Sequence, residues 1–344
     1  MNENKGYVAL IYFILRSSFI GLTSMCILSS LNQDAWIGII LGTIVGLFPI
    51  TLIYKIIDEK SEESLLESIP KLFPKLGKYI KIIFTIFIFT YTCLNFWNLI
   101  NLITSQYLNK TPYLLISICF LIPIVQLIKK KNQIISQIAF ILFIISIFLY
   151  ILTFIGLISK IEISNILPIM EYNTIDGIYY YISYNVLPII VLLVFPGKYI
   201  KKSLYKGYLL SSISLIISTI VLISVLGIDL TLLFQYPEFH ILKLVFDGFI
   251  TFRLENLLAL QWIIDIYILI SMGLKFTNES LNIKKIYITP IIMLLICNYF
   301  IPNNTIIIYI IKYYYPTIII VIVQTLLLII YIKKELFLKN NSSN

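Results

Sequence analysis

Long apolar stretches recur along the whole chain, and they constrain its fold more than any other feature. Each runs for about 17 residues or more, which is long enough for a helix to cross the hydrocarbon core of a bilayer. Only 12% of the 344 residues are charged, whereas soluble domains carry about 25%. The sequence therefore predicts an integral membrane protein.

The apolar stretches predict ten spanning helices within a single transmembrane domain that covers residues 1–344. The spans cover residues 7–28, 35–57, 80–104, 112–128, 134–158, 178–196, 207–227, 255–274, 286–302 and 307–332. The first stretch has no small-residue cleavage site and is followed at once by another span. We therefore expect a retained helix there rather than a signal peptide.

Basic residues predict the orientation of these spans, since loops rich in Lys and Arg stay on the cytoplasmic side. One alternating set of connections and termini holds 20 of the 26 Lys and Arg residues, whereas the opposite set holds 4. We therefore expect both termini, including the tail 333–344, in the cytoplasm. The same distribution accounts for the net charge of +9, so nucleic acid is not expected as a partner.

The ten spans divide into two repeats of five, 7–158 and 178–332. Because five is an odd number, the second repeat starts from the opposite face of the membrane, and the two repeats are inverted. Inverted repeats with discontinuous first helices are typical of secondary transporters, where the breaks bind small polar solutes near the midplane. The predicted fold is an all-α polytopic membrane protein with a 5+5 inverted repeat.

The first span of each repeat carries residues that interrupt a helix at membrane depth. These are Gly21 in the first repeat and Pro188 in the second, where proline cannot continue the helical hydrogen-bond ladder. The polar residues beside the breaks are Arg16, Ser17, Ser18, Ser183, Tyr184 and Asn185. We favour a solute site here over the alternative that Pro188 only kinks its helix and the serines bond back to their own helix.

Two charged residues lie deep inside their spans, about ten residues from the start: Arg16 in the first and Asp265 in the eighth. A charge at that depth is costly unless it is paired or hydrated. Arg16 could bind the carboxylate of a ligand or form an ion pair with Asp265, and the sequence leaves both open. Gln261 lies four residues before Asp265 and shares its helix face, where it could form a pocket wall.

Three asparagines form a polar stripe on one face of the span 80–104, and this face must meet protein or water rather than lipid. Interhelical hydrogen bonds explain such a stripe as well as a solute site does. The full set of candidate ligand-binding residues is Arg16, Ser17, Ser18, Asn95, Asn98, Asn101, Tyr184, Asn185, Gln261 and Asp265, with Gly21 and Pro188 as helix breaks.

Residues 231–252, on the outer side, have apolar side chains at helical spacing with charged residues elsewhere around the wheel. This pattern predicts a helix that lies in the outer interface of the membrane.

No enzymatic motif is present in the sequence. His240 is the only histidine, so neither a histidine-based catalytic pair nor a histidine-based metal site can be assembled. The four cysteines have no paired spacing. We expect no catalytic activity, no metal and no cofactor.

Several short motifs resemble those of the spore germination permease family, the B subunits of nutrient germinant receptors in endospore-forming bacteria. The motifs are Gln33-Asp34-Ala35-Trp36-Ile37 followed by Gly42 and Gly46, Tyr236-Pro237-Glu238, Arg253-Leu254-Glu255-Asn256, Gln261-Trp262, and the lysine-rich stretch from Pro196 to Lys206. The resemblance extends over the chain in length, helix count and loop placement.

This resemblance implies a fold like that of the amino acid–polyamine–organocation transporters, that is, LeuT/APC-like, and a location in the spore inner membrane. It also implies a complex with a membrane A subunit and a lipoprotein C subunit. In that family an amino acid germinant is thought to bind in a pocket formed by the broken first and sixth helices with the third and eighth.

The chain departs from the family pattern at both breaks. The usual glycines and Leu-Pro of the first break are replaced by the run from Arg16 to Thr23, in which Gly21 is the only glycine, and the second break lacks the expected small residue before Pro188. A backbone without small residues admits a zwitterion less closely. Three functions follow: a germinant-receptor subunit, which we favour, a proton- or sodium-coupled amino-acid permease, and a scaffold that binds no ligand.

Overall fold

The computed structural model describes residues 3–59, 61–245, 254–300 and 304–342. Over these ranges the chain is built from helices and contains no strand beyond one isolated bridge between Ser64 and Pro196. Among the described residues, seven helical stretches are long and apolar enough to cross a membrane. Two shorter apolar helices, Tyr113–Ile128 and Ile288–Tyr299, accompany them. The all-helical membrane architecture expected from the sequence is therefore confirmed.

The first part of the chain, up to residue 160, folds into seven α-helices and three short π- or 3₁₀-helical turns. They are α1 (Glu3–Arg16), η1 (Phe19–Thr23), α2 (Ser24–Leu31), η2 (Asn32–Asp34), α3 (Ala35–Ile56), α4 (Leu65–Leu72), α5 (Gly77–Gln106), α6 (Tyr113–Ile128), α7 (Asn132–Leu157) and η3 (Ile158–Lys160).

The remaining part is helical as well. Its elements are η4 (Ile163–Ile166), α8 (Ile175–Tyr181), η5 (Ile182–Val186), η6 (Leu187–Val194), α9 (Gly197–Leu233), α10 (Pro237–Leu242), α11 (Leu254–Leu258), α12 (Leu260–Ser280), α13 (Ile288–Phe300), α14 (Asn304–Tyr309), η7 (Ile310–Tyr314) and α15 (Tyr315–Ser342). Helical residues occupy each of the ten ranges predicted as spans.

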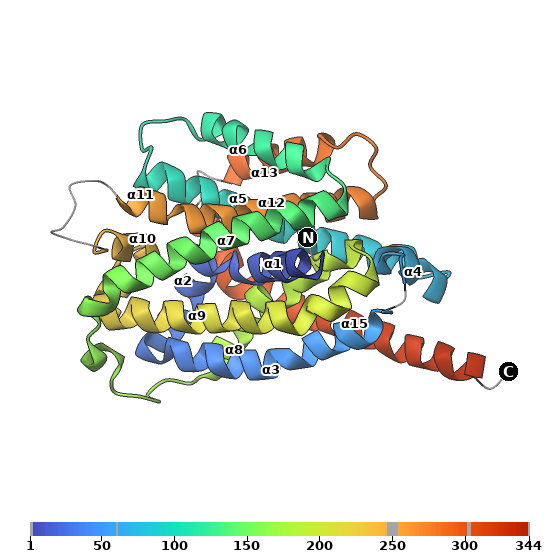
Figure 1. Cartoon of the computed structure of the whole chain (residues 1–344), viewed down its shortest axis with the longest axis horizontal. Coiled ribbons are helices and arrows are strands. Elements are labelled where there is room, and N and C mark those ends of the chain that lie inside the picture. Colours follow the sequence, from blue (N-terminus) through green and yellow to red (C-terminus); the bar gives the residue numbers. More distant parts are fainter. Residues whose placement is uncertain (1–2, 60, 246–253, 301–303, 343–344) are drawn as a thin grey trace.

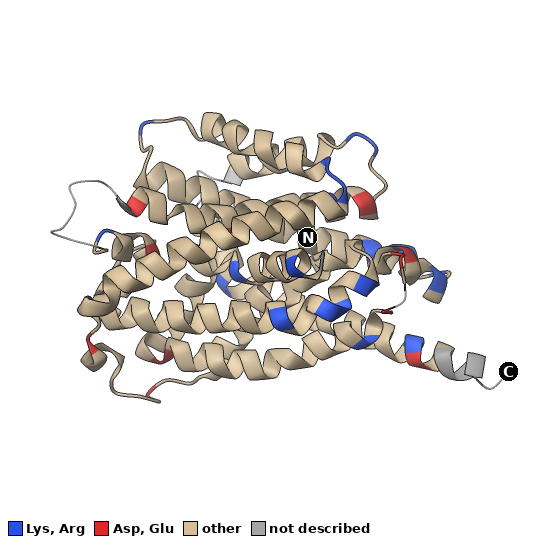
Figure 2. Cartoon of the chain, viewed as in Figure 1, with Lys and Arg blue, Asp and Glu red and all other residues tan. Residues whose placement is uncertain are grey.

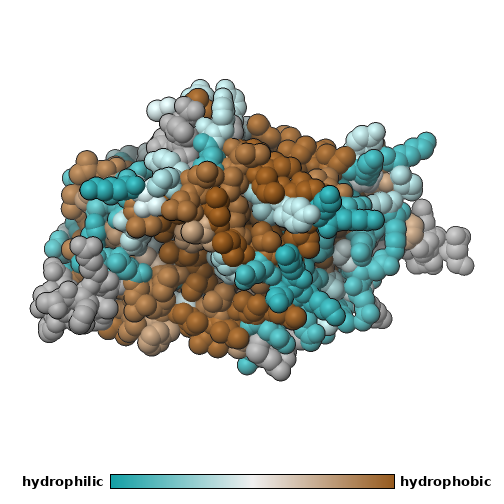
Figure 3. Space-filling view, turned by 90° about the horizontal axis from the view of Figure 1, so that it is seen from above, coloured by the Kyte–Doolittle hydropathy of each residue, from teal (hydrophilic) through white to brown (hydrophobic). Residues whose placement is uncertain are grey.

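The helices form an elongated bundle with α1 near its centre and α3 and α6 on opposite sides (Figure 1). α1 packs against α7, α9 and α12, so its apolar residues are buried on almost every side. α7, in contrast, exposes Ile141, Phe148 and Ile155. Apolar side chains cover much of the middle of the face seen in Figure 3. An exposed apolar surface of this kind suits contact with lipid rather than water.

Charged side chains are unevenly distributed along the bundle. Figure 2 shows Lys and Arg gathered mainly toward the end that carries α4, from which α15 also projects. At this end exposed Lys198 is bonded to Glu62 with an Nζ to Oε1 distance of 2.8 Å. α10 and the start of α3 lie at the opposite end (Figure 1).

The segment 231–252 differs from the single interfacial helix that its periodicity predicts. α9 continues to Leu233, the chain then turns, and a separate short helix, α10, begins at Pro237. The turn arises because a residue before proline avoids helical geometry, and Tyr236 has φ −131° and ψ 74°. Most of α10 is buried under the bundle end rather than exposed. Residues 246–252 of the prediction lie outside the described residues.

Candidate functional site

The first span is interrupted at Ile20 and Gly21, between α1 and α2. Ile20 has an extended ψ of 120° and Gly21 a positive φ of 73°, a conformation that glycine adopts without strain. A Cβ at Gly21 would lie 2.5 Å from Oδ1 of Asn98 and 2.7 Å from Cε1 of Tyr236. Both the backbone and the packing therefore require glycine here.

The second interruption lies in the α8–η6 segment. After α8 the chain passes through the π turn η5 and into the 3₁₀ helix η6, near whose start lies Pro188. The two interruptions are bonded to each other. Ser18 and Tyr91 both donate hydroxyl hydrogen bonds of 2.8 Å to the carbonyl oxygen of Tyr184. Asn185 donates to the carbonyl oxygen of Leu15 at 2.7 Å.

The three asparagines of α5 have different roles. Asn98 donates to the freed carbonyl oxygen of Ile20 at 2.7 Å, so it supports the first break directly. Asn101 donates to the Tyr236 hydroxyl at 2.8 Å, and that hydroxyl lies 3.2 Å from Oδ1 of Asn98. Asn95 bonds back to Tyr91 on its own helix at 3.0 Å. The amide stripe thus links α5 to the break and to the start of α10.

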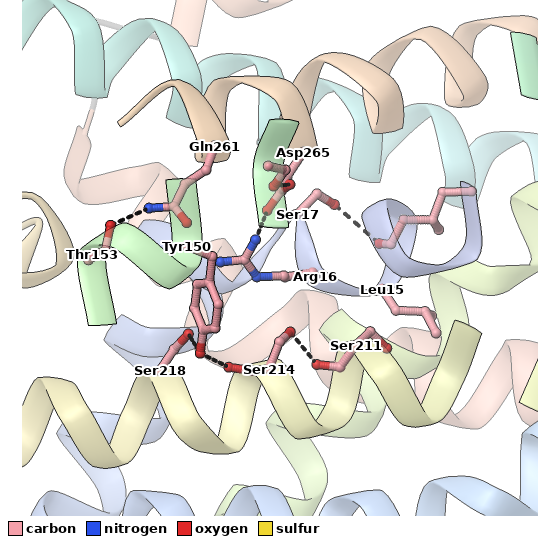
Figure 4. A network of polar contacts seen from close by, with 12 residues as sticks. Leu15, Arg16, Ser17, Tyr150, Thr153, Ser211, Ser214, Ser218, Gln261 and Asp265 are labelled. Carbon is pink, nitrogen blue, oxygen red and sulfur yellow. Dashed lines mark hydrogen bonds and ion pairs between the residues drawn. The ribbon is translucent and has the colours of Figure 1, made fainter. Parts of the chain in front are cut away.

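Arg16 and Asp265 form a buried ion pair, with 2.9 Å between Nη1 and Oδ2 and side chains that are 4% and 1% exposed. Figure 4 shows the guanidinium directed toward α12 beside the ring of Tyr150, whose centroid lies 5.0 Å from Cζ. Of the two roles that the sequence left open for Arg16, the structure contains the ion pair. Ser17 bonds back to Ile14 of its own helix at 3.1 Å.

A pocket lies beside this ion pair, between α7, α9, α10 and α12. Its cavity volume is about 50 Å³. Gln261 in its wall donates from Nε2 to the Thr153 hydroxyl at 3.4 Å (Figure 4), while its Oε1 has no partner among the described residues. The lining residues that matter below are Arg16, Phe19, Tyr150, Phe154, Glu238 and Trp262.

Glu238 of α10 also lines this pocket, and sequence reasoning did not place it among the candidate site residues. Its side chain is buried, and neither carboxylate oxygen has a hydrogen-bond partner of normal geometry within the described ranges. Burial raises the pKa of Glu238 to about 7, an effect that the nearby Ser24 side chain and Gly21 backbone offset only in part. Its place in the Tyr-Pro-Glu motif was the one available signal.

The predicted site residues thus separate into two neighbouring groups. Ser18, Tyr184 and Asn185 meet where the two breaks cross, while Arg16, Asp265 and Gln261 lie at or beside the pocket. In the part of the chain that the structure describes, no three His, Cys, Asp or Glu side chains cluster as metal ligands.

The fold and the paired helix breaks define a multi-pass membrane protein with a transporter-like architecture. The chain resembles the crystal structure of an Eremococcus coleocola manganese transporter in complex with an aromatic bis-isothiourea substituted compound, with a TM-score of 0.50 and 14% identity. The match covers 89% of this chain and 71% of that one. A mutant of the same transporter matches with a TM-score of 0.50 and 13% identity. At such low identity the likeness shows the fold alone.

Residues 2–301 match the family model described as "Spore germination protein". The chain therefore belongs to the spore germination protein family. It is also 24% identical over 317 residues to "Putative spore germination protein YfkT" of Bacillus subtilis (strain 168), a match that covers 87% of each chain. The family resemblance drawn from the sequence motifs is confirmed.

Proposed function

We propose that this protein is a subunit of a spore nutrient germinant receptor that binds an amino acid or a similar small germinant. The observation that carries the proposal is the pair of interrupted helices that bond to each other beside a pocket, in a member of a spore germination family. Broken helices of this kind form the solute sites of secondary transporters.

The arrangement that we propose has ten spans in two inverted LeuT/APC-like repeats, in the spore inner membrane. Both termini are placed in the cytoplasm, which the gathering of Lys and Arg at one end of the bundle supports. The partners are a membrane A subunit and a lipoprotein C subunit, as in the nutrient receptors that the sequence resembles.

Signalling would follow from a population shift. A germinant that binds one arrangement of the broken helices more tightly than the other favours that arrangement by the difference in binding free energy, and partner subunits respond to it. No covalent chemistry is required, so we propose a binding protein rather than an enzyme.

A coupled permease is the second candidate, and a fold that resembles that of a solved transporter is compatible with it. A proton-coupled mechanism would need a carboxylate within the bundle, and Asp265 is buried inside α12. Because Asp265 is engaged by Arg16, each transport cycle would have to break that ion pair. The third candidate, a scaffold without a ligand, predicts that pocket variants have no effect on nutrient response.

Disruption of the gene tests these functions. We expect the mutant spores to lose the fall in optical density with one or more amino acids, while uptake of the same amino acids by vegetative cells stays normal. Normal germination with impaired uptake would instead identify a permease.

A single-residue variant then tests the site. Asn98→Ala removes the hydrogen bond to the Ile20 carbonyl, and we expect the germinant concentration for half-response to shift about fivefold or more, the effect of a free-energy change of about 1 kcal/mol. Asn298→Ala is the matched control, because Asn298 bonds to Leu294 on its own helix α13. Equal responses of the two variants, both assembled, would favour the scaffold.

A further inference from the structure

The charges around the pocket do not balance. Arg16 and Glu238 are the charged side chains among the described residues of its lining. Arg16 is already paired with Asp265, with 2.9 Å between Nη1 and Oδ2, so a ligand carboxylate would have to compete with Asp265 for this guanidinium. Glu238 has no cation beside it among the described residues and accepts no hydrogen bond of normal geometry, and the nearby Ser24 hydroxyl and Gly21 backbone offset its burial only in part. A buried carboxylate left in this state favours a positively charged partner.

Among the described residues of the pocket lining, the buried polar side-chain atoms that form no hydrogen bond of normal geometry are all acceptors. They are the two carboxylate oxygens of Glu238 and Oε1 of Gln261. A primary ammonium has three N–H donors and no acceptor, which complements such a set. An anion or a carbonyl group would add further acceptors to it.

The rest of the lining suits an organic cation. Four aromatic side chains from three elements contribute to the pocket, namely Phe19 of η1, Tyr150 and Phe154 of α7, and Trp262 of α12. Aromatic faces attract alkylammonium groups through their quadrupoles and provide apolar contact for the attached carbon chain. Aromatic rings combined with a carboxylate form a common type of ammonium site.

We propose that the pocket binds its ligand through a primary ammonium group, with Glu238 as the counter-charge, and that a carboxylate on the ligand is not required. This inference rests on the proposed function, because it names the ligand class of the same pocket. It places recognition at α10, beside the break at Gly21, rather than at the Arg16 side chain.

Three small molecules with the same branched carbon skeleton test this inference. They are valine, isobutylamine, which lacks the carboxylate of valine, and isovalerate, which lacks its amino group. The full-length protein in lipid nanodiscs is titrated with each, and the dissociation constant and the change in Tm are measured. Methylamine and 2-phenylethylamine extend the amine series to smaller and larger ligands.

We expect at least one of the amines to bind and raise the Tm, and isovalerate to have no effect. Glu238→Gln, which preserves the side-chain shape, should weaken amine binding at least tenfold. Glu62→Gln, at the exposed pair with Lys198, is the matched control and should bind as the wild type does. No binding by any of the three amines, binding of isovalerate, or equal amine affinity in Glu238→Gln and the wild type would overturn the inference.

The receptor role and the ammonium site can fail separately. Amine binding that depends on Glu238, combined with unchanged germination after gene disruption, would reject the receptor role and retain the site. Germination that responds to valine but not to any of the amines, equally in the wild type and Glu238→Gln spores, would retain the receptor and reject the site.

Discussion

Asp34 and Glu238 are both buried carboxylates in short motifs at the end of the bundle opposite α4, yet their surroundings differ completely. Asp34 precedes α3 and accepts backbone N–H hydrogen bonds from Met170, Glu171 and Tyr172 at 2.8, 2.8 and 3.0 Å. Glu238 is almost as deeply buried, but its carboxylate accepts no hydrogen bond of normal geometry from the described residues. The two carboxylates therefore differ in the hydrogen bonds that they accept and not in how deeply they are buried.

This difference separates a structural carboxylate from one available to a ligand. Three N–H donors compensate the desolvation of Asp34 and fix the segment that precedes α8 against the start of α3. Asp265 belongs with Asp34 in this respect, because Arg16 supplies its compensation from within the chain. Only Glu238 of the three lacks a described partner, so its compensation would come from a bound molecule or a proton.

The largest expected effect on stability comes from removing Arg16, the counter-charge of Asp265. Arg16→Met leaves that carboxylate buried and unpaired, and we expect a loss of about 3–5 kcal/mol in unfolding free energy. Thermal unfolding in detergent measures it. The double variant Arg16→Met, Asp265→Leu should recover most of the loss, since no charge remains buried. A single variant as stable as the wild type would show that the ion pair does not compensate Asp265.

The role assigned to Asp34 predicts a smaller loss. Asp34→Ala removes the acceptor for three backbone N–H groups, and we expect destabilisation by about 1–3 kcal/mol with ligand affinity unchanged. Chemical unfolding and an amine titration of the same sample give both quantities. If the Asp34→Ala variant bound the amine more weakly but were as stable as the wild type, Asp34 would be a ligand-binding carboxylate like Glu238.

The pH dependence of amine binding sharpens the comparison further. Burial raises the pKa of Glu238 to about 7, so the fraction of ionised carboxylate falls as the pH falls through 7. An ammonium binds the ionised form, and we therefore expect affinity to rise roughly tenfold between pH 6 and pH 8, as linkage requires.

Other titratable groups near Glu238 do not account for such a change. Arg16 of α1 is paired with Asp265 of α12, and burial raises the pKa of the Tyr236 phenol above its usual value. His240, on the same helix as Glu238, stacks on Phe234 and has its pKa lowered by burial. An equal pH profile in Glu238→Gln would contradict the assignment to Glu238.

The smallest expected effect is that of Glu238→Gln on stability without ligand. Because the carboxylate has no described partner to lose, we expect the unfolding free energy at pH 8 to change by less than about 1 kcal/mol, with a slight gain favoured. Thermal unfolding of Glu238→Gln and Asp34→Ala under the same conditions compares the two stability losses directly. A loss as large as that of Asp34→Ala would mean that Glu238 is a structural carboxylate.

The all-helical, membrane-spanning character of the chain could be predicted from the sequence because length and hydrophobicity are local properties. The family could be recognised for the same reason, since its motifs are short runs of residues. The choice between roles for Arg16 was not local: its partner lies 249 positions away, and only the packing of α1 against α12 brings the two together.

Glu238 was missed for a related physical reason. The periodicity of 231–252 predicts one face toward lipid and one toward water, and on such a helix a glutamate is simply solvated. Pro237 instead starts a separate short helix that packs beneath the bundle end, and burial changes what that glutamate can do. Similarly, the even spacing of Asn95, Asn98 and Asn101 gave no sign that Asn95 bonds within its own helix while the other two reach outward.

The hydroxyl of Tyr236 has a kinetic consequence. It lies within 3.4 Å of the backbone and side-chain oxygens of Asn98 and accepts a hydrogen bond from Asn101, and α10 begins at the next residue. These contacts hold the start of α10 against α5, so α10 can move away from the bundle only after the Tyr236 hydroxyl releases α5. In the receptor that we propose, slow release of this contact would lengthen the time for which a germinant stays bound.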